Sequence, residues 1–400
     1  MDLGAVLALN GELERFVAEV FVPGQPAAGA ARRAEMWAHH LRGSLLTDIK
    51  RKTATGMGRV LGVATQSLNH LVTDSPWRWE PVQNRIAVRA QRLLRPSAWA
   101  IDDTTFLKEG HGSVGVARQH SGRAGGLANC QAAVSVTGCG KTGAIPLAWR
   151  LFLPKSWNPQ VSAERRLTCR VPEDARHRRK WELALDALDE LLGQGLTPPP
   201  ILADQDYGRA GEFRDGLTAR GLGFVVQVNT NVSLLPWRAE PDTAWAREHD
   251  RVPATALAAG ATRIPVSWRT TDGDRVARFS LLRVREAGTS ARQRASQARA
   301  CLPDRWLLVQ WDNGKPDKPA HLWLAHLPGT TRPTIQHMVR LAKTRWAIET
   351  GYRELKDTLG IDHFEGRTWP GWHRHVTLVT AALLFLTEHQ TRTAKLVAPA

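Results

Sequence analysis

The sequence has few cysteines, no long apolar run and no segment that resembles a targeting signal. Its four cysteines lie far apart among 400 residues, with no Cys-x-x-Cys pair, so neither a disulfide framework nor a zinc site is expected. The longest apolar run, residues 376–386, is too short to cross a bilayer. The first residues, MDLGAVLALNGELERF, lack the basic start of a secretory signal. We therefore expect a cytoplasmic protein with no membrane partner.

Acidic residues are scarce relative to basic ones. Lys and Arg number 54 against 38 Asp and Glu, which gives a formal net charge of +16 and a pI near 10.5. Such an excess predicts a polyanionic partner, and nucleic acid is the commonest one. Hydrophobic residues at 42% and charged residues at 23% are ordinary for a globular protein, which excludes a disordered, collagen-like or coiled-coil chain as a whole.

Residues 1–95 are expected to form a helical N-terminal domain. Within it, residues 57–72 read MGRVLGVATQSLNHLV, where Gly62 separates two short stretches with helical spacing and Thr65 is expected to cap the second. This pattern is typical of a helix-turn-helix that binds DNA. A plain helical hairpin explains it equally well, so both interpretations stay open.

An α/β fold is expected from residue 96 onward, with a mixed sheet flanked by helices. We expect helices at residues 180–192 and 209–220 and strands at 98–103, 114–120, 131–137, 145–153, 201–203 and 224–229. Alternating stretches separated by turn signals predict a β-rich insertion at residues 231–330. Residues 96–230 and 331–400 would then be the two parts of one core. The last apolar helix is expected at about residues 373–388.

Three acids stand at positions suited to chemistry. Asp103 ends the first strand of the core, and Asp204 ends the strand at residues 201–203. Carboxylates at the carboxyl ends of strands project into the crevice where α/β proteins place their sites. The third acid, Glu349, lies on a helix that is expected to run from residue 334 to about residue 359.

The helix of Glu349 is also expected to carry cations on the same face. At 100° per residue, Arg345 and Lys356 lie within about 40° of Glu349. Tyr352 and Arg353 lie within about 60° of it. Cations around one acid suit a phosphate backbone that approaches a metal ion.

Carboxylates from two strands and one helix are ligands that suit Mg²⁺, a hard ion that prefers oxygen. Two such ions, about 4 Å apart, can activate an attacking water or hydroxyl and stabilise the leaving oxygen. A structural alternative remains for the same residues. Aspartates at strand ends often cap turns, and Arg345 with Glu349 could form an i, i+4 ion pair.

At these residues the sequence resembles the DDE transposases of bacterial insertion sequences, which have an RNase H-like catalytic core. Asp103 lies in AIDDTT and Asp204 in ILADQDYG, which are similar to the segments that carry the first two metal-binding aspartates. The third family motif is Tyr, two residues, Arg, three residues, Glu, six residues, Lys. Arg345, Glu349 and Lys356 fit it without a gap. The tyrosine position is Ala342, a departure for which Tyr352 is a candidate substitute.

Further segments resemble the same family, and the resemblance extends over about residues 97–385. They read FLKEGHGSVGVARQHSG, LPKSW and IDHFEGRTWPGWHRH. The family also has a β-strand insertion between its second Asp and its Glu. Asp102 stays an alternative to Asp103, because adjacent strand residues point to opposite faces.

The resemblance implies a DNA transposase that binds the inverted repeats of its own element, cleaves DNA and joins it to a target. It implies two Mg²⁺ ions, or Mn²⁺ in their place, held by Asp103, Asp204 and Glu349. It also implies a homodimer on paired transposon ends, associated with the nucleoid. A nuclease without strand transfer and a transposase-derived DNA-binding regulator are the alternatives.

Several other residues are expected near DNA. In relatives an aromatic residue receives a flipped base, and Trp346 matches it by position, although core packing explains a tryptophan equally well. Lys108, Lys155 and the basic run at residues 176–180 are candidates for guiding the backbone. His363, His373 and His375 lack metal-ligand spacing and are expected to contact phosphate or solvent.

Overall fold

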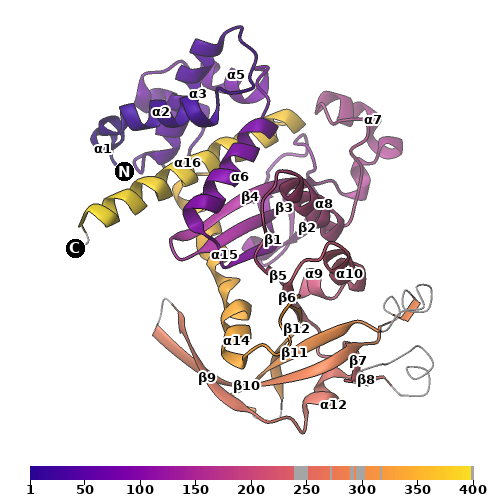
Figure 1. Ribbon diagram of the computed structural model, residues 1–400. Coiled ribbons are helices and arrows are strands. Elements are labelled where there is room, and N and C mark those ends of the chain that lie inside the picture. Colours follow the sequence, from indigo (N-terminus) through magenta and orange to yellow (C-terminus); the bar gives the residue numbers. More distant parts are fainter. Residues whose placement is uncertain (238–250, 271–272, 289–291, 294–301, 316–317, 398–400) are drawn as a thin grey trace. The chain divides into compact units, whose positions relative to one another are not determined.

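The computed structural model describes residues 1–237, 251–270, 273–288, 292–293, 302–315 and 318–397 (Figure 1). Within these residues the protein has the expected mixed α/β architecture, with a mixed sheet and flanking helices. The chain divides into two compact units. The first contains residues 1–96, 102–196 and 347–400, and the second contains residues 97–101 and 197–346.

The first unit begins with helices, as the sequence predicted for residues 1–95. They are α1 (Leu3–Ala8), α2 (Asn10–Val20), α3 (Ala30–Leu45), α4 (Ala54–Leu61), α5 (Thr65–Thr73) and α6 (Glu80–Leu94). Helix α16 (Trp369–Val397), yellow in Figure 1, packs against α3, α5 and α6. Buried aromatic rings join these helices: Trp37 lies 5.3 Å from Phe21 and 5.8 Å from Trp77 between ring centroids. Such large apolar side chains stabilise the helical layer mainly through the water they exclude.

Helices α4 and α5 form two adjoining helices, as expected both for a helix-turn-helix and for a plain helical hairpin. Gly62 ends α4 in the left-handed region, with φ +68°, which a residue without a Cβ adopts freely. The expected cap is wrong by one residue. Ala64 occupies the N-cap position of α5 without a side-chain hydrogen bond, and Thr65 is the first helical residue.

The strands of the first unit are β1 (Ala98–Leu107), β2 (Ala117–Ser121), β3 (Gly126–Gly140) and β4 (Gly143–Phe152). β2, β3 and β4 pair antiparallel in consecutive order. Helix α8 (Lys180–Gly193) packs on β3 and β4, and α6 packs on the same two strands. Helix α7 (Pro159–Thr168) and two short 3₁₀ segments, Gly122–Ala124 and Lys155–Trp157, complete the connections. β1 contributes residues to both units.

The second unit is a sheet with helices α9 (Gln205–Gly208), α10 (Gly211–Ala219), α12 (Ala254–Ala258) and α14 (Ile335–Thr344). Its strands are β5 (Ile201–Ala203), β6 (Phe224–Val228), β7 (Ser233–Pro236), β8 (Val252–Pro253), β9 (Ile264–Thr270), β10 (Gly273–Glu286), β11 (Asp304–Trp311) and β12 (Pro319–His326). The strand order is β5-β6-β12-β11-β10-β7-β8, and β9 pairs with β10. β5 is parallel both to β6 and to the start of β1.

A buried group of charges holds part of the second unit together. The carboxylate of Glu286 on β10 accepts hydrogen bonds from Arg214 on α10, at 2.9 Å, and from Arg305 on β11, at 3.1 Å. Burial by itself would raise the pKa of Glu286, but the charges of the two arginines outweigh it and lower the pKa. The acid therefore stays ionised and links a helix to two strands.

The sequence predicted one continuous helix over residues 334–359, and this prediction is wrong. Thr334 does cap it, since its hydroxyl accepts from the backbone N–H of His337 at 3.2 Å. However, α14 ends before Arg345, α15 covers Trp346–Arg353, and a π-helical turn follows at Glu354–Thr358. The interruption coincides with the boundary between the two units, so each half packs within its own unit. None of the described helices is both long and apolar enough to span a membrane.

The described cysteines, Cys130, Cys139 and Cys169, are buried free thiols. Cys301 lies outside the described residues.

Candidate active site

The two adjacent aspartates of β1 have different neighbours in the first unit. Asp103 accepts a hydrogen bond from the ammonium of Lys180, with 2.6 Å between Oδ2 and Nζ. Asp102 accepts from the backbone N–H of Asp103 at 2.9 Å, and its negative charge acts on Lys356. The alternation of side chains along a strand therefore separates the acids, as the sequence predicted.

Lys180 is the first residue of α8, and the sequence placed it only within a basic run. It follows Arg179, whose backbone N–H donates to the carboxylate of Glu182 at 2.7 Å. This hydrogen bond satisfies an N–H group at the start of α8, where the Lys180 ammonium lies near Asp103. No sequence pattern could have paired two residues that lie 77 positions apart.

Asp204 follows β5 directly and caps the next helix. Its Oδ1 accepts from the backbone N–H of Asp206 at 2.9 Å and from that of Tyr207 at 3.3 Å. This is the capping role that the sequence offered as the structural alternative. In the second unit Ile101 of β1 pairs with Ala203 of β5 in a parallel register. Asp204 follows β5, but the prediction that Asp103 ends its strand is wrong, because β1 continues to Leu107.

Glu349 lies on the exposed side of α15, and the next turn anchors this helix on the sheet of the first unit. A Cβ at Gly351 would lie 3.1 Å from the carbonyl oxygen of Ala144 on β4, so only a small residue allows this approach. The hydroxyl of Tyr352 lies 2.7 Å from that of Ser135 on β3. These contacts fix the helix and leave the Glu349 carboxylate facing solvent.

The other residues expected near DNA on this segment lie in different environments. Arg345 is half-buried at the break between α14 and α15, and Arg353 is exposed. The side chain of Trp346 is 40% exposed, so its indole is not enclosed in a core. Exposed aromatic faces can stack on nucleic acid bases.

The two lysines expected to contact phosphate are partly buried. Burial lowers the pKa of Lys356, and the negative charges of Asp362 and Asp102 oppose that shift. Burial also lowers the pKa of Lys108 to about 8. The Lys108 ammonium donates to the backbone carbonyl of Phe364 and lies 5.5 Å from the centre of its ring.

Two histidines expected to contact phosphate or solvent are instead buried in α16. Burial lowers the pKa of His373 and of His375 to about 3 each, so both rings are neutral near pH 7. His373 stacks on Trp79 with ring centroids 5.2 Å apart. The sequence predicted the helix, but only the packing of α16 against α3, α5 and α6 shows that its first turns are buried.

The carboxylates suit a divalent metal in their chemistry. Among the residues that the structure describes, no three His, Cys, Asp or Glu side chains are grouped as metal ligands. Asp103 and Glu349 belong to the first unit and Asp204 to the second. Carboxylate oxygen is nevertheless the hard donor that Mg²⁺ prefers, and Asp103 already holds a cation in the form of the Lys180 ammonium.

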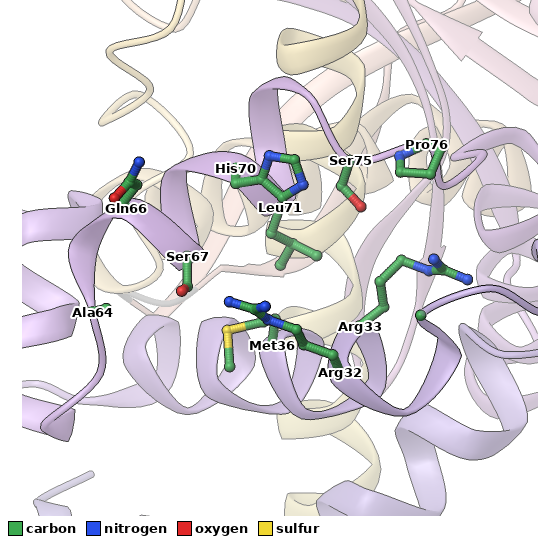
Figure 2. Close-up of a pocket in the computed structure, with 11 residues that line it drawn as sticks. Arg32, Arg33, Met36, Ala64, Gln66, Ser67, His70, Leu71, Ser75 and Pro76 are labelled. Atoms are coloured by element: carbon green, nitrogen blue, oxygen red, sulfur yellow. The ribbon is translucent and has the colours of Figure 1, made fainter.

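The helical layer of the first unit offers a polar surface on α5. A cavity of about 510 Å³ borders α3 and α5. In Figure 2 its lining residues Arg32, Arg33 and Met36 of α3 lie opposite Gln66, Ser67, His70 and Leu71 of α5. Gln66, Asn69 and His70 are exposed. In a helix-turn-helix, amide, hydroxyl and imidazole side chains on the second helix are suited to contact base edges in the major groove. Here the second helix of the α4–α5 pair is α5.

A family model described as DDE superfamily endonuclease matches residues 26–299, about two thirds of the chain. The chain therefore belongs to this family of endonucleases. The matched region includes Asp103 and Asp204 and ends before Glu349. A comparison with curated proteins gave no match.

Proposed function

We propose that this protein is a DNA transposase that binds the inverted repeats of its own insertion sequence, cleaves the DNA and transfers a strand to a target. Membership in the endonuclease family supports DNA cleavage. The spacing of Arg345, Glu349 and Lys356, which matches the third transposase motif, supports the more specific activity. The net charge of +16 and the α4–α5 helix pair fit a DNA substrate.

The observation that carries the proposal is the position of the first two acids. Asp103 lies just beyond the part of β1 that pairs in parallel with β5, and Asp204 lies just beyond β5. The carboxyl ends of paired parallel segments hold the functional groups of open α/β sheets, although β1 itself continues past Asp103 to Leu107. In the proposal Asp103, Asp204 and Glu349 together hold two Mg²⁺ ions, or Mn²⁺ in their place. Bound metal would activate the attacking oxygen and stabilise the leaving one.

The chain's own side chains would position the DNA. Arg345, Arg353 and Lys356 would hold phosphates near the scissile bond, with Tyr352 and Lys108 beside them. A phosphate near Lys356 would stabilise its charged form, against the burial that lowers its pKa. The exposed indole of Trp346 would stack on a base displaced from the duplex. Two copies of the chain would act on paired ends within the nucleoid.

The test is a strand-transfer assay on DNA that carries the element's ends, with Mg²⁺ and the wild type, Asp103→Asn, Asp102→Asn and Asp204→Asn. Asparagine is chosen at residue 204 because its amide oxygen can still accept the two N–H groups of α9. We expect the variants at 103 and 204 to lose about 100-fold or more in rate, since loss of even an outer partner of a metal ligand costs about 10–100-fold. Their thermal midpoints should stay near that of the wild type.

Asp102→Asn is the matched control, one residue away on the same strand. If it abolishes activity and Asp103→Asn does not, the first ligand is Asp102. Full activity in Asp204→Asn would remove this residue from the site and contradict the proposal.

A second candidate function is favoured by the description of the family, which names an endonuclease. A nuclease would use the same acids to hydrolyse DNA without joining it to a target. The reaction products distinguish a transposase from a nuclease. Joined molecules require a 3′-hydroxyl as the nucleophile, whereas a nuclease leaves only cleaved ends.

A further inference from the structure

Lys52 is a buried cation between α3 and α4. Its side chain is only 5% exposed, and its Nζ has no hydrogen-bond partner among the described atoms. Burial lowers the pKa of Lys52 to about 8, and the charge of Asp48 opposes this shift. A buried ammonium without a partner is costly to a fold, which makes an anionic ligand a favourable complement.

Lys52 lines a cavity of about 270 Å³ within the first unit. This volume is several times the roughly 30 Å³ of a water molecule in the liquid, so it can hold a phosphate group. Thr53 and Asn69 add a hydroxyl and an amide group to the lining, whereas the hydroxyl of Thr73 already donates to the carbonyl of Asn69 and to the Asp74 carboxylate. Hydroxyl and amide groups donate hydrogen bonds to oxyanions without adding charge.

The histidines of the lining supply neutral hydrogen-bonding groups. The Nδ1 of His363 accepts the backbone N–H of Lys52 at 2.9 Å, so the neutral ring carries its hydrogen on Nε2. Burial lowers the pKa of His40 to about 4, and its Nδ1 has no partner among the described atoms.

The acidic residue in the lining does not cancel the charge of Lys52. Glu365 is exposed and forms an ion pair with Arg51 at 3.2 Å. A cation and several neutral donors therefore remain, which suits an anion and not a metal ion.

The start of α4 lies at the same cavity. Thr53 is the N-cap of this eight-residue helix, and its hydroxyl accepts from the backbone N–H of Gly56 at 3.1 Å. The first-turn N–H groups and the helix dipole both favour a negative charge at a helix N-terminus. Asn69 and Thr73 come from α5, so both helices of the pair border the site.

The cavity of Figure 2 has no buried cation comparable to Lys52 among its described lining residues. There Arg33 donates to the backbone carbonyls of Pro26 and Ala28, and Arg32 is exposed. Its buried cation is already paired with oxygen, whereas Lys52 combines burial, an unpartnered ammonium and a helix N-terminus.

We propose that Lys52 and the first turn of α4 form a phosphate-binding site. Its ligand is a phosphate group, supplied either by a DNA backbone or by free phosphate. The site goes beyond the proposed function, because it requires neither metal nor cleavage. If DNA supplies the phosphate, the contact fixes the α4–α5 pair on the duplex without reading its sequence.

The test compares the full-length wild type with Lys52→Met and with Lys50→Met, an exposed lysine two residues away. Inorganic phosphate is titrated at constant ionic strength by calorimetry, and duplex DNA is titrated by fluorescence anisotropy at several salt concentrations. Lys52→Met should fold, since it removes a buried charge, and its thermal midpoint checks this. Lys52→Gln serves as a second variant if it does not.

We expect Lys52→Met to weaken binding of phosphate, of duplex DNA or of both about tenfold, close to 1.4 kcal/mol. Lys50→Met should leave phosphate binding unchanged. A loss confined to DNA, with a salt slope lower by about 0.9, identifies the backbone as the source. A loss with inorganic phosphate identifies a free anion. Equal affinities of Lys52→Met and Lys50→Met for both probes would overturn the proposal, whatever the outcome of the strand-transfer assay.

Discussion

Tyr352 and Ser135 form a contact in which a side chain expected at DNA is used inside the protein. Their hydroxyl oxygens lie 2.7 Å apart, and the ring of Tyr352 lies 6.2 Å from that of Trp149. A partly buried phenol usually keeps one such partner. The hydroxyl can therefore position α15, and with it Glu349, whether or not it also reaches a phosphate.

Tyr352→Phe separates these two uses. Loss of the hydrogen bond should lower the stability of the first unit by about 0.5–1.5 kcal/mol. Ser135→Ala should cost a similar amount, and the double variant should cost less than the sum because both changes remove one interaction. Thermal unfolding measures the stability of all three variants. Weaker DNA binding in Tyr352→Phe but not in Ser135→Ala would instead show that the phenol contacts DNA.

At the scale of elements, α9 lies close to the backbone of β6. A Cβ added at Gly208 would lie 1.9 Å from the carbonyl oxygen of Gln227, a separation that no side chain allows. Asp204 caps this helix, so the approach of α9 to β6 also determines where the Asp204 carboxylate lies.

Gly208→Ala should therefore push α9 away from β6. We expect a loss of about 1–3 kcal/mol, as for other overpacked sites, and a lower DNA cleavage rate because Asp204 moves. Gly193→Ala is the control, since a Cβ at this glycine of α8 meets no atom within 4 Å. Thermal unfolding and a cleavage assay measure both variants. A wild-type midpoint in Gly208→Ala would show that the strand and helix separate without cost.

The sequence predicted elements well where one pattern decided them. The cap at Thr334, the break at Gly62 and the strand that ends at Asp204 all follow from local chemistry. The interruption at Arg345 could not be predicted, because it depends on which unit each half of the helix packs against. Likewise, the pairing of Asp103 with Lys180 depends on tertiary structure, which local spacing does not record.

At the scale of the whole molecule, buried neutral histidines make the folded protein less stable in acid. Burial lowers the pKa of His40 to about 4 and that of His373 and His375 to about 3, from an ordinary value of 6.5. The unfolded chain takes up these protons near pH 6.5, and the folded chain does so only near pH 4 or below. The stability that depends on these neutral histidines is therefore fully present above pH 6.5, and it is lost as the pH falls toward 4.

His373→Leu tests this dependence, because neither ring nitrogen of His373 has a hydrogen-bond partner among the described atoms. Each of the three histidines should lower the free energy of unfolding by roughly 2 kcal/mol between pH 7 and pH 5. The thermal midpoint of His373→Leu should consequently fall less between pH 7 and pH 5 than that of the wild type. His337→Leu, at an exposed histidine of α14, is the control. Identical pH profiles for the wild type and His373→Leu would contradict the conclusion that His373 is buried in its neutral form.

Net charge predicted a polyanionic partner for the molecule, and family membership agrees with a DNA substrate. Charge alone could not locate the cations, however. Lys52 is one of 54 lysine and arginine residues, and only the fold shows that it is buried beside a cavity. The same holds for the histidines of α16, whose polarity suggested solvent and whose helix is apolar.

The π turn at Glu354–Thr358 has a consequence for insertions and deletions in the gene. Its hydrogen bond joins the N–H of Leu359 to the carbonyl of Glu354, at 3.1 Å, and so spans one residue more than an α-helical turn. Loss of one codon here would convert the turn to a regular α-helical turn and leave the later residues in nearly the same orientation relative to Glu349, because a π turn is an α-helical turn with one residue added. Lineages of this protein should therefore tolerate loss of one residue in this segment better than loss of one residue in α15.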